Sequence, residues 1–234
     1  MNERKKFLVV EGQTGSGKGT FIRQFLNYNS EYEPLPEIHQ FMVAQNTGIS
    51  KYDEIYDQQN TYVCAHISRY KLINNSTKAY LIERDFVSQV VYSMTCAKLK
   101  GWTNIFPLFQ LLQEQITNLL LPLLYVYIDC NSKIALSRKI CRGSSRLEGI
   151  PSWCSGDLIN VFELERSRIY KYIFTNVDYP VFLINSNKNF GENEFSDIIT
   201  KSIINRASFS TQGEEISKFI SSLEELSRKY LTLN

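Results

Sequence analysis

A glycine-rich stretch near the N-terminus constrains the fold more than any other part of the sequence. It consists of Gly12, Gln13, Thr14, Gly15, Ser16, Gly17, Lys18, Gly19 and Thr20. An apolar run at 7–10, typical of a strand buried on both faces, precedes it, and a helix is predicted at 20–27. Glycines between a strand and a helix let backbone N–H groups surround an anion at the positive end of the helix, and the lysine adds a point charge for nucleotide phosphates. The stretch therefore predicts a nucleotide-binding loop in an α/β fold.

The loop departs from the usual motif at one position. A serine or threonine that can ligate Mg²⁺ normally follows the lysine directly. This chain has Gly19 there, and the hydroxyl comes one residue later, at Thr20. Thr20 is therefore the candidate metal ligand of the loop, and Mg²⁺ ligation by the loop stays an open question, whereas nucleotide binding does not depend on this hydroxyl.

Apolar runs alternate with helical patterns along the whole chain. Such alternation predicts an α/β domain with a mainly parallel sheet of about five strands flanked by helices. The last strand has to join the same sheet as the first, so residues 1–234 are expected to form a single domain. Strands are expected at 7–10, 32–36, 78–82, 123–128 and 180–184, and helices at 20–27, 52–74, 86–100, 105–121, 132–141, 158–176 and in two closing segments.

The composition excludes several classes of protein. With 43% hydrophobic residues and a net charge of only +2, the chain is neither generally disordered nor suited to coat a polyanion. Its five cysteines are scattered and form no CxxC pair, which indicates free thiols in a reducing compartment. No apolar run is long enough for a signal peptide or a membrane span. We therefore expect a cytoplasmic protein that binds neither nucleic acid nor membranes.

Carboxylates at the ends of two predicted strands indicate an acceptor site for phosphoryl transfer. Glu37 follows the second strand, and Glu83-Arg84-Asp85 follows the third, both at the edge where open α/β sheets bind ligands. Glu37 could take the proton of a hydroxyl acceptor, while Glu83 and Arg84 could contact a metal ion and a phosphate. Taken singly, Glu37 could instead be a helix-start carboxylate, and the tripeptide a surface ion pair.

Arginines recur at every fourth position after the predicted fourth strand. Arg138, Arg142 and Arg146 lead into a loop punctuated by Gly143 and Gly149. Guanidinium groups held over a transferring phosphoryl group stabilise its charge. A solvated basic helix face is the alternative interpretation of the same spacing.

Together these motifs resemble the deoxynucleoside kinase family over nearly the whole chain. The resemblance implies a P-loop kinase fold with an arginine-rich lid at about 138–151, ATP as phosphate donor, Mg²⁺ as cofactor and a small-molecule deoxynucleoside as acceptor. It rests on Val10-Glu11-Gly12 before the phosphate loop, Pro36-Glu37, Glu83-Arg84 with Asp85 in the place of a serine, the run from Ala135 through Arg142 to Pro151, and the run from Tyr179 through Asn187 to Phe190.

The resemblance also implies a role for each matching residue. Glu37 would be the general base for the 5′-hydroxyl, and Arg84, Arg138 and Arg142 would contact the transferring phosphoryl group. Glu83, together with Thr20, would hold Mg²⁺. The donor would be bound by the loop from Gly12 to Thr20 and by Arg146, Asn187 and Phe190. The deoxynucleoside would be bound by Tyr52, Tyr56, Gln58, Gln59, Arg69, Gln89 and Glu148.

Parts of the family pattern match only approximately. The glutamate that binds the sugar falls one residue out of register, so Glu148 fits with a one-residue slip. The family's second lid arginine has no counterpart in register, and Arg146 is the substitute. The glutamine and arginine that read the base are farther apart here, at Gln58 and Arg69, yet still on one helix face. The base preference is therefore not predicted.

Three functions remain in competition. The leading hypothesis is ATP-dependent phosphorylation of the 5′-hydroxyl of a deoxynucleoside. The family resemblance also implies a homodimer formed through the helices at 86–100 and 105–121. The first alternative is a nucleoside monophosphate kinase similar to thymidylate kinase, although that family has an arginine and an aspartate where this chain has Pro36 and Glu83. The second is a nucleotide-binding regulatory subunit without turnover, suggested by Gly19 and the imperfect lid.

Overall fold

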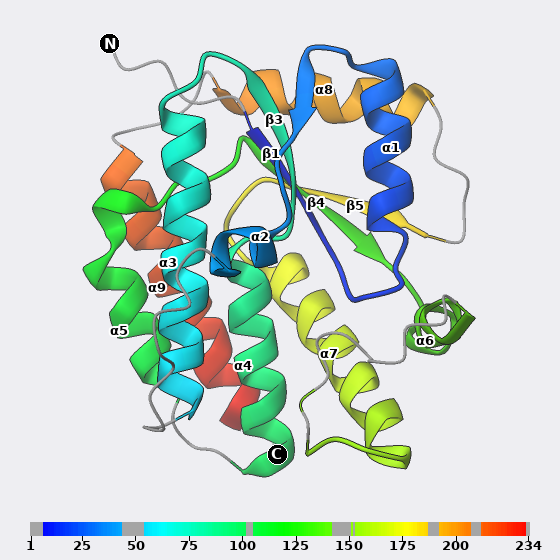
Figure 1. The fold of residues 1–234 in the computed structure, drawn as a ribbon, viewed down its shortest axis with the longest axis vertical. Coiled ribbons are helices and arrows are strands. Elements are labelled where there is room, and N and C mark those ends of the chain that lie inside the picture. Colours follow the sequence, from blue (N-terminus) through cyan, green and yellow to red (C-terminus); the bar gives the residue numbers. More distant parts are fainter. Residues whose placement is uncertain are drawn as a thin grey trace.

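A parallel sheet forms the centre of the protein (Figure 1). The computed structural model describes residues 7–43, 54–101, 105–141, 151, 153–186, 192–206 and 212–232. Within these ranges the sheet has five strands in the order β2-β3-β1-β4-β5, and every neighbouring pair is parallel. The strands are β1 (Phe7–Glu11), β2 (Tyr32–Pro34), β3 (Ala79–Glu83), β4 (Leu124–Asp129) and β5 (Val181–Asn185). The predicted α/β fold class is confirmed.

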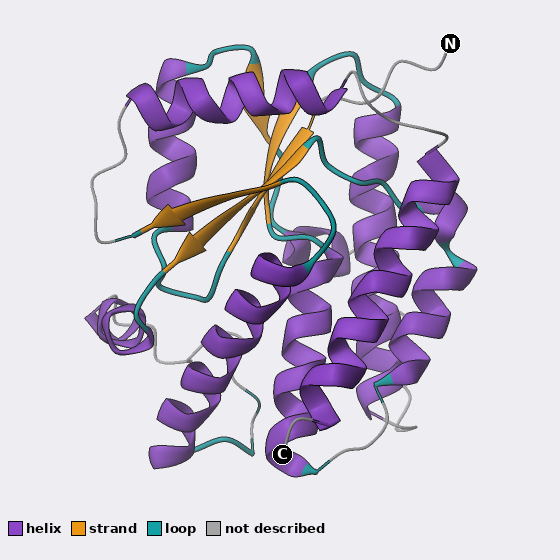
Figure 2. Ribbon diagram, turned by 180° about the vertical axis from the view of Figure 1, so that it is seen from behind, coloured by secondary structure: helices purple, strands orange, loops and turns teal. Residues whose placement is uncertain are grey.

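Helices cover both faces of the sheet, as the views from the front and from behind show (Figures 1 and 2). The smaller layer, on one face, contains α1 (Lys18–Tyr28) and α8 (Glu192–Arg206). The larger layer, on the other face, contains α3 (Glu54–Asn74), α4 (Phe86–Lys100), α5 (Phe106–Glu114), α7 (Asp157–Asn176) and α9 (Gln212–Thr232).

Side-chain alternation in the strands explains the two layers. In β1, Phe7 and Val9 pack into the larger cluster, whereas Leu8 and Val10 pack into the smaller one. Successive side chains of a strand point to opposite faces, so a strand covered on both sides must be apolar throughout. This is why the run at 7–10 shows no polar alternation in the sequence.

Two helices differ from the sequence-based expectation. A short helix, α2 (Ile38–Val43), follows Glu37 and was not predicted. The helix expected at 105–121 ends at Glu114 and continues as a 3₁₀ turn, Ile116–Asn118. Residues 119–121 are buried before Pro122 and belong to no helix or strand, and Leu119 is in an extended conformation. A residue that precedes proline disfavours the helical conformation. By contrast, α4 and α6 (Ser132–Cys141) have the predicted bounds.

Two further expectations concern the surroundings of the protein. All five cysteines lie within the described residues, and each is a free thiol. No helix in the described ranges combines the length and apolar character needed to cross a bilayer.

Candidate active site

The phosphate loop adopts a backbone that requires glycine. It joins β1 to α1, and Gly12, Gly15 and Gly17 have positive φ angles of 142°, 86° and 106°. A Cβ atom on Gly15 would lie 2.1 Å from the carbonyl oxygen of Ala135 in α6, and one on Gly12 would lie 2.8 Å from that of Ile128. The glycines therefore allow both the turn and its close contact with β4 and α6.

Lys18 is the buried cation of this loop, with 3% of its surface exposed. Its ammonium group donates hydrogen bonds to the carbonyl oxygens of Gly12 (2.8 Å) and Gln13 (3.0 Å) and lies 3.6 Å from Glu83 Oε1. Burial, followed by the neighbouring charge of Arg84, lowers the pKa of Lys18 to about 7, and the nearby carboxylates only partly oppose this shift. A phosphate group beside the ammonium would raise the pKa of Lys18 again, because a negative charge favours the charged form of the lysine.

The turn after β3 brings the predicted acceptor-side motif, Glu83-Arg84-Asp85, next to the phosphate loop. Arg84 has a φ of 61°, the left-handed region that non-glycine residues rarely adopt. Its backbone N–H donates to the carbonyl of Val10 (3.0 Å), and its Nη2 donates to Thr14 Oγ1 (2.8 Å). Parallel strands end at the same edge of the sheet, so Glu83 and Arg84 lie beside the loop that follows β1.

Two buried carboxyl groups fix the base of this site. Glu11 accepts hydrogen bonds from the backbone N–H of Asp85 (2.9 Å) and the hydroxyl of Ser88 (2.7 Å). Asp85 caps α4 by accepting from Val87 N (2.9 Å), and it accepts from the Tyr125 hydroxyl (2.6 Å). Burial raises the pKa of both carboxyl groups. Asp85 thus performs the capping that a serine would perform, and it also ties α4 to β4.

Glu37 lies at the same edge, in the segment between β2 and α2. Its side chain is exposed, and its carboxylate pairs with His39 Nδ1 at 3.3 Å. The preceding residue pair is held to the sheet because Leu35 N donates to the carbonyl of Leu81 (3.3 Å). Glu37 therefore lies next to solvent, where an acceptor hydroxyl could reach it, and its role as general base stays a prediction.

Arg138 is the one predicted lid arginine within the described residues. It lies in α6, is half-buried, and its Nη1 donates to Cys130 Sγ at 3.8 Å. The carbonyl of Cys130 accepts from Gln13 Nε2 (2.8 Å), so a single residue links Arg138 to the phosphate loop. The other predicted lid and donor-binding residues, Arg142, Arg146, Glu148, Asn187 and Phe190, lie outside the described residues.

Three of the predicted deoxynucleoside-binding residues have described side chains, and they lie on α3 (Gln59 and Arg69) and α4 (Gln89). Gln59 is buried and donates to Ser93 Oγ (3.1 Å), which joins the two helices. Gln89 is buried on α4, and Arg69 is buried on α3 with its guanidinium directed to main-chain carbonyl groups after β3. Tyr52 and the side chains of Tyr56 and Gln58 lie outside what the structure describes.

Charged residues of α7 that no sequence motif indicated form a buried cluster, and Arg166 of this cluster is near enough to lower the pKa of Lys18. Glu163, Arg166 and Lys139 are all buried; Arg166 Nη2 lies 2.6 and 2.8 Å from the two carboxylate oxygens of Glu163, and Lys139 Nζ lies 3.4 Å from Oε1. One turn farther, the Tyr170 hydroxyl lies 2.8 Å from Ser88 Oγ. The available signal was the three-residue spacing of Glu163 and Arg166 on the apolar face of the helix.

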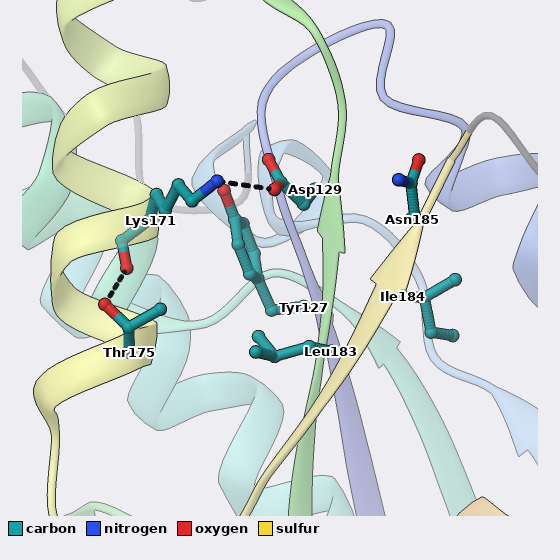
Figure 3. Close-up of a pocket in the computed structure, with 7 residues that line it drawn as sticks. All are labelled: Tyr127, Asp129, Lys171, Thr175, Leu183, Ile184 and Asn185. Atoms are coloured by element: carbon teal, nitrogen blue, oxygen red, sulfur yellow. Dashed lines mark hydrogen bonds and ion pairs between the residues drawn. The ribbon is translucent and has the colours of Figure 1, made fainter.

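A cavity of about 190 Å³, with no residue of the phosphate loop in its lining, lies between the ends of β4 and β5 and helix α7 (Figure 3). At its rim Lys171 Nζ pairs with Asp129 Oδ2 at 3.2 Å. Asp129 ends β4, and both side chains of this ion pair are exposed, so the pair contributes little to holding α7 on the sheet. The cavity is lined by Tyr127, Asp129, Lys171, Thr175, Leu183, Ile184 and Asn185.

Comparisons with known proteins place this fold. No family model matches the sequence, and no curated protein matches it. Solved structures do match it, and three of them are of deoxyadenosine kinase from M. mycoides. This chain has the fold of deoxyadenosine kinase. The first structure holds the products dCMP and a flexible dCDP (TM-score 0.58, 17% identity), the second holds dATP (0.59, 16%), and the third holds dCTP (0.56, 16%). Each match covers 83% of this chain and 97% of the deoxyadenosine kinase chain.

Proposed function

We propose that the protein transfers the γ-phosphoryl group of ATP to the 5′-hydroxyl of a deoxynucleoside. The observation that carries this proposal is the junction of the two motifs: Glu83 and Arg84 lie directly against Lys18 and Thr14 of the phosphate loop. A donor-phosphate site and an acceptor-side carboxylate and guanidinium are thus adjacent. Deoxyadenosine kinase structures with bound nucleotides share the fold, which supports the same assignment.

The loop fits the phosphates of a nucleotide. Within the described residues the hydroxyl of Ser16 is buried without a hydrogen-bond partner, and the Lys18 ammonium is held by carbonyl oxygens that a phosphate could replace. Backbone N–H groups at the start of α1 add to the positive potential. We propose that Lys18 and Arg84 stabilise charge on the transferring group, with Arg138, Arg142 and Arg146 from the lid.

The residues also fit Mg²⁺ held jointly with substrate. No cluster of three ligand-type side chains occurs in the described part of the chain. Mg²⁺ commonly needs only one or two protein ligands and takes the rest from phosphates and water. Glu83, with Thr20 as a second candidate, would be that protein contact, and bound Mg²⁺ would neutralise developing charge on the phosphates.

Proton transfer falls to Glu37 in this proposal. The 5′-oxygen forms a bond to the γ-phosphorus while the bond from phosphorus to the β–γ bridging oxygen breaks and ADP leaves. Glu37 accepts the hydroxyl proton, because it is an exposed carboxylate at the substrate edge of the sheet. The deoxynucleoside would lie between this edge and the α3 and α4 residues Gln59 and Gln89.

One assay separates the three candidate functions. Purified protein is incubated with ATP and Mg²⁺ and with each deoxynucleoside or each deoxynucleoside monophosphate, and ADP formation is measured. ADP formation with deoxynucleosides supports the proposal. Turnover with monophosphates alone would favour the thymidylate kinase-like alternative, and no turnover with either class would favour the regulatory subunit.

The role of Glu37 is tested by Glu37→Gln. We expect turnover to fall by about 10²–10⁴-fold, the usual contribution of a general base, while ATP binding persists. Glu33→Gln is the matched control. Glu33 lies in β2, the strand that leads to Glu37, but its carboxylate pairs with Lys78, which directly precedes β3 and so lies at the other edge of the sheet. Near-normal turnover of Glu37→Gln would remove this residue from the mechanism.

The assembly and location are part of the same proposal. We propose a homodimer in the cytoplasm, where free thiols such as those of the five cysteines persist. The helices α4 and α5 place most of their described apolar side chains in the core of one subunit. Their polar faces would therefore have to form the contact, and sedimentation equilibrium of the purified protein measures the subunit number.

A further inference from the structure

Arg69 is one of the most deeply buried large side chains of the protein, with 1% of its surface exposed. It projects from α3, and its guanidinium reaches the main chain after β3. Nη1 donates to the carbonyl oxygen of Arg84 (2.9 Å), and Nη2 donates to that of Glu83 (3.3 Å). Two nitrogens of one planar fork therefore hold two consecutive carbonyl groups.

The turn that Arg69 contacts includes the left-handed backbone of Arg84. A non-glycine residue at a φ of 61° is strained, and such a conformation persists only where the surroundings hold it. Two residues of β1 accept hydrogen bonds from the N–H groups of the turn. Arg84 N donates to Val10 O (3.0 Å), and Asp85 N donates to Glu11 Oε1 (2.9 Å). Arg69 holds the carbonyl groups of the same turn.

The turn presents the two side chains on which the proposed chemistry depends. Glu83 lies 3.6 Å from the Lys18 ammonium, and the Arg84 guanidinium lies 2.8 Å from the Thr14 hydroxyl. A shift of the turn would move both groups away from the phosphate loop. A mispositioning of about 1 Å can reduce turnover by about 10²-fold.

A buried guanidinium needs strong compensation. Burial lowers the pKa of Arg69, and acidic neighbours that include Asp85, Glu11 and Glu83 oppose this shift. A lysine would provide the charge but not the rigid fork that matches two acceptors at once. The residue type therefore fits a clamp on the backbone.

We infer that Arg69 is a positioning residue that holds the Glu83-Arg84 turn against the phosphate loop, and not a reader of the nucleobase. The catalytic meaning of this inference rests on the proposed kinase function. Its structural part, the clamp, does not depend on the identity of the substrate.

The test compares Arg69→Gln and Arg69→Lys with the wild-type protein, and Ser68→Ala serves as the control on the neighbouring position of α3. For each accepted deoxynucleoside, kcat and KM are measured. We expect Arg69→Gln to lower kcat by about 10–100-fold, by the same factor for every base, with little change in KM. Arg69→Lys should recover part of the loss, and Ser68→Ala should behave as wild type. If Arg69→Gln does not fold, the Lys variant alone decides, with a uniform fall in kcat as the expected result.

Amide hydrogen exchange gives a second measurement that needs no activity. The amides of Arg84 and Asp85 should exchange faster in Arg69→Gln, whereas those of the β1–β4 pair should be unchanged. Unchanged exchange at Arg84 and Asp85, or a changed ranking of deoxynucleosides with a raised KM, would overturn the inference. A wild-type protein that phosphorylates no deoxynucleoside would refute the proposed function instead, and the exchange experiment would still test the clamp.

Discussion

Gly15 lies so close to α6 that any side chain would collide with the main chain of Ala135. Its φ of 86° adds strain for every other residue. We expect Gly15→Ala to reduce the free energy of unfolding by about 2–4 kcal/mol, because left-handed strain and overpacking add together. Urea denaturation measures this loss.

Gly19 supplies the matched control for this substitution. A Cβ atom there would meet no other atom within 4 Å, and the residue is inside α1. Gly19→Ala should therefore stabilise the protein by up to about 1 kcal/mol, since alanine favours the helix. If both variants lost the same free energy of unfolding, the close contact and the positive φ angle of Gly15 would not be the cause of the loss.

The lowered pKa of Lys18, about 7, predicts a pH dependence of nucleotide binding. Below pH 7 the lysine is charged before binding, so the affinity for ADP should vary little with this group. Above pH 7 the free lysine is neutral, and phosphate binding must take up a proton, so the affinity should fall by up to tenfold per pH unit.

Calorimetric titration with ADP between pH 7.5 and 9 measures this effect, because phosphate groups with a pKa of about 6 no longer titrate there. Buffers with different ionisation enthalpies report the proton uptake directly. Lys18→Met should bind more weakly and show no proton uptake from this position. An affinity independent of pH over this range in the wild-type protein would contradict the prediction.

At the scale of elements, buried charges join α6, the helix that leads toward the predicted lid, to α7 of the larger layer. The carboxylate of Glu163 in α7 forms ion pairs with Arg166 of the same helix and with Lys139 of α6, and all three side chains are buried. We expect Glu163→Gln to lower the free energy of unfolding by about 3–5 kcal/mol, because it removes the shared carboxylate from two buried cations.

Glu224→Gln is the control at an exposed ion pair. Glu224 pairs with Arg228 one turn along α9, at 2.6 Å, and the arginine is more than half exposed. Such a pair contributes about 0.2–1 kcal/mol, so thermal and urea unfolding should change little. Similar losses for the two variants would indicate that the charges of α6 and α7 are screened by solvent.

At the scale of the whole molecule, the last helix completes a core that the first half of the chain begins. The apolar face of α9 packs on α4, α5 and α7, and Leu223 is fully buried there. Leu223→Ala should destabilise the protein by about 2–5 kcal/mol through the cavity that it leaves. The exposed Leu183 is the control, and Leu183→Ala should change stability by less than about 0.5 kcal/mol.

Urea unfolding followed by two probes checks this prediction. Fluorescence and circular dichroism should give one coincident transition for Leu223→Ala, shifted to lower urea, if α9 belongs to the same cooperative unit as the sheet. If circular dichroism showed an earlier transition than fluorescence, α9 would unfold separately from the sheet.

Much of the fold and part of the site follow from local sequence patterns. The apolar runs, bounded by glycine and proline, predicted the strands to within a few residues, and glycine spacing predicted the phosphate loop. The helix at 105–121 was predicted too long because its apolar pattern continues through residues 119–121, which are buried but belong to no helix. Helical and non-helical segments bury leucine equally well, so the pattern did not distinguish them.

The sequence by itself determined the phosphate loop, the parallel α/β sheet and the placement of Glu37, Glu83 and Arg84 at strand ends, because strand polarity brings those ends to one edge. Only the tertiary structure decided that Arg69 clamps the main chain and that Glu163 joins α6 to α7. Periodicity specifies which face of a helix is buried, but the partner of that face depends on how distant elements pack. Contacts between residues far apart in the sequence therefore had to be seen in three dimensions.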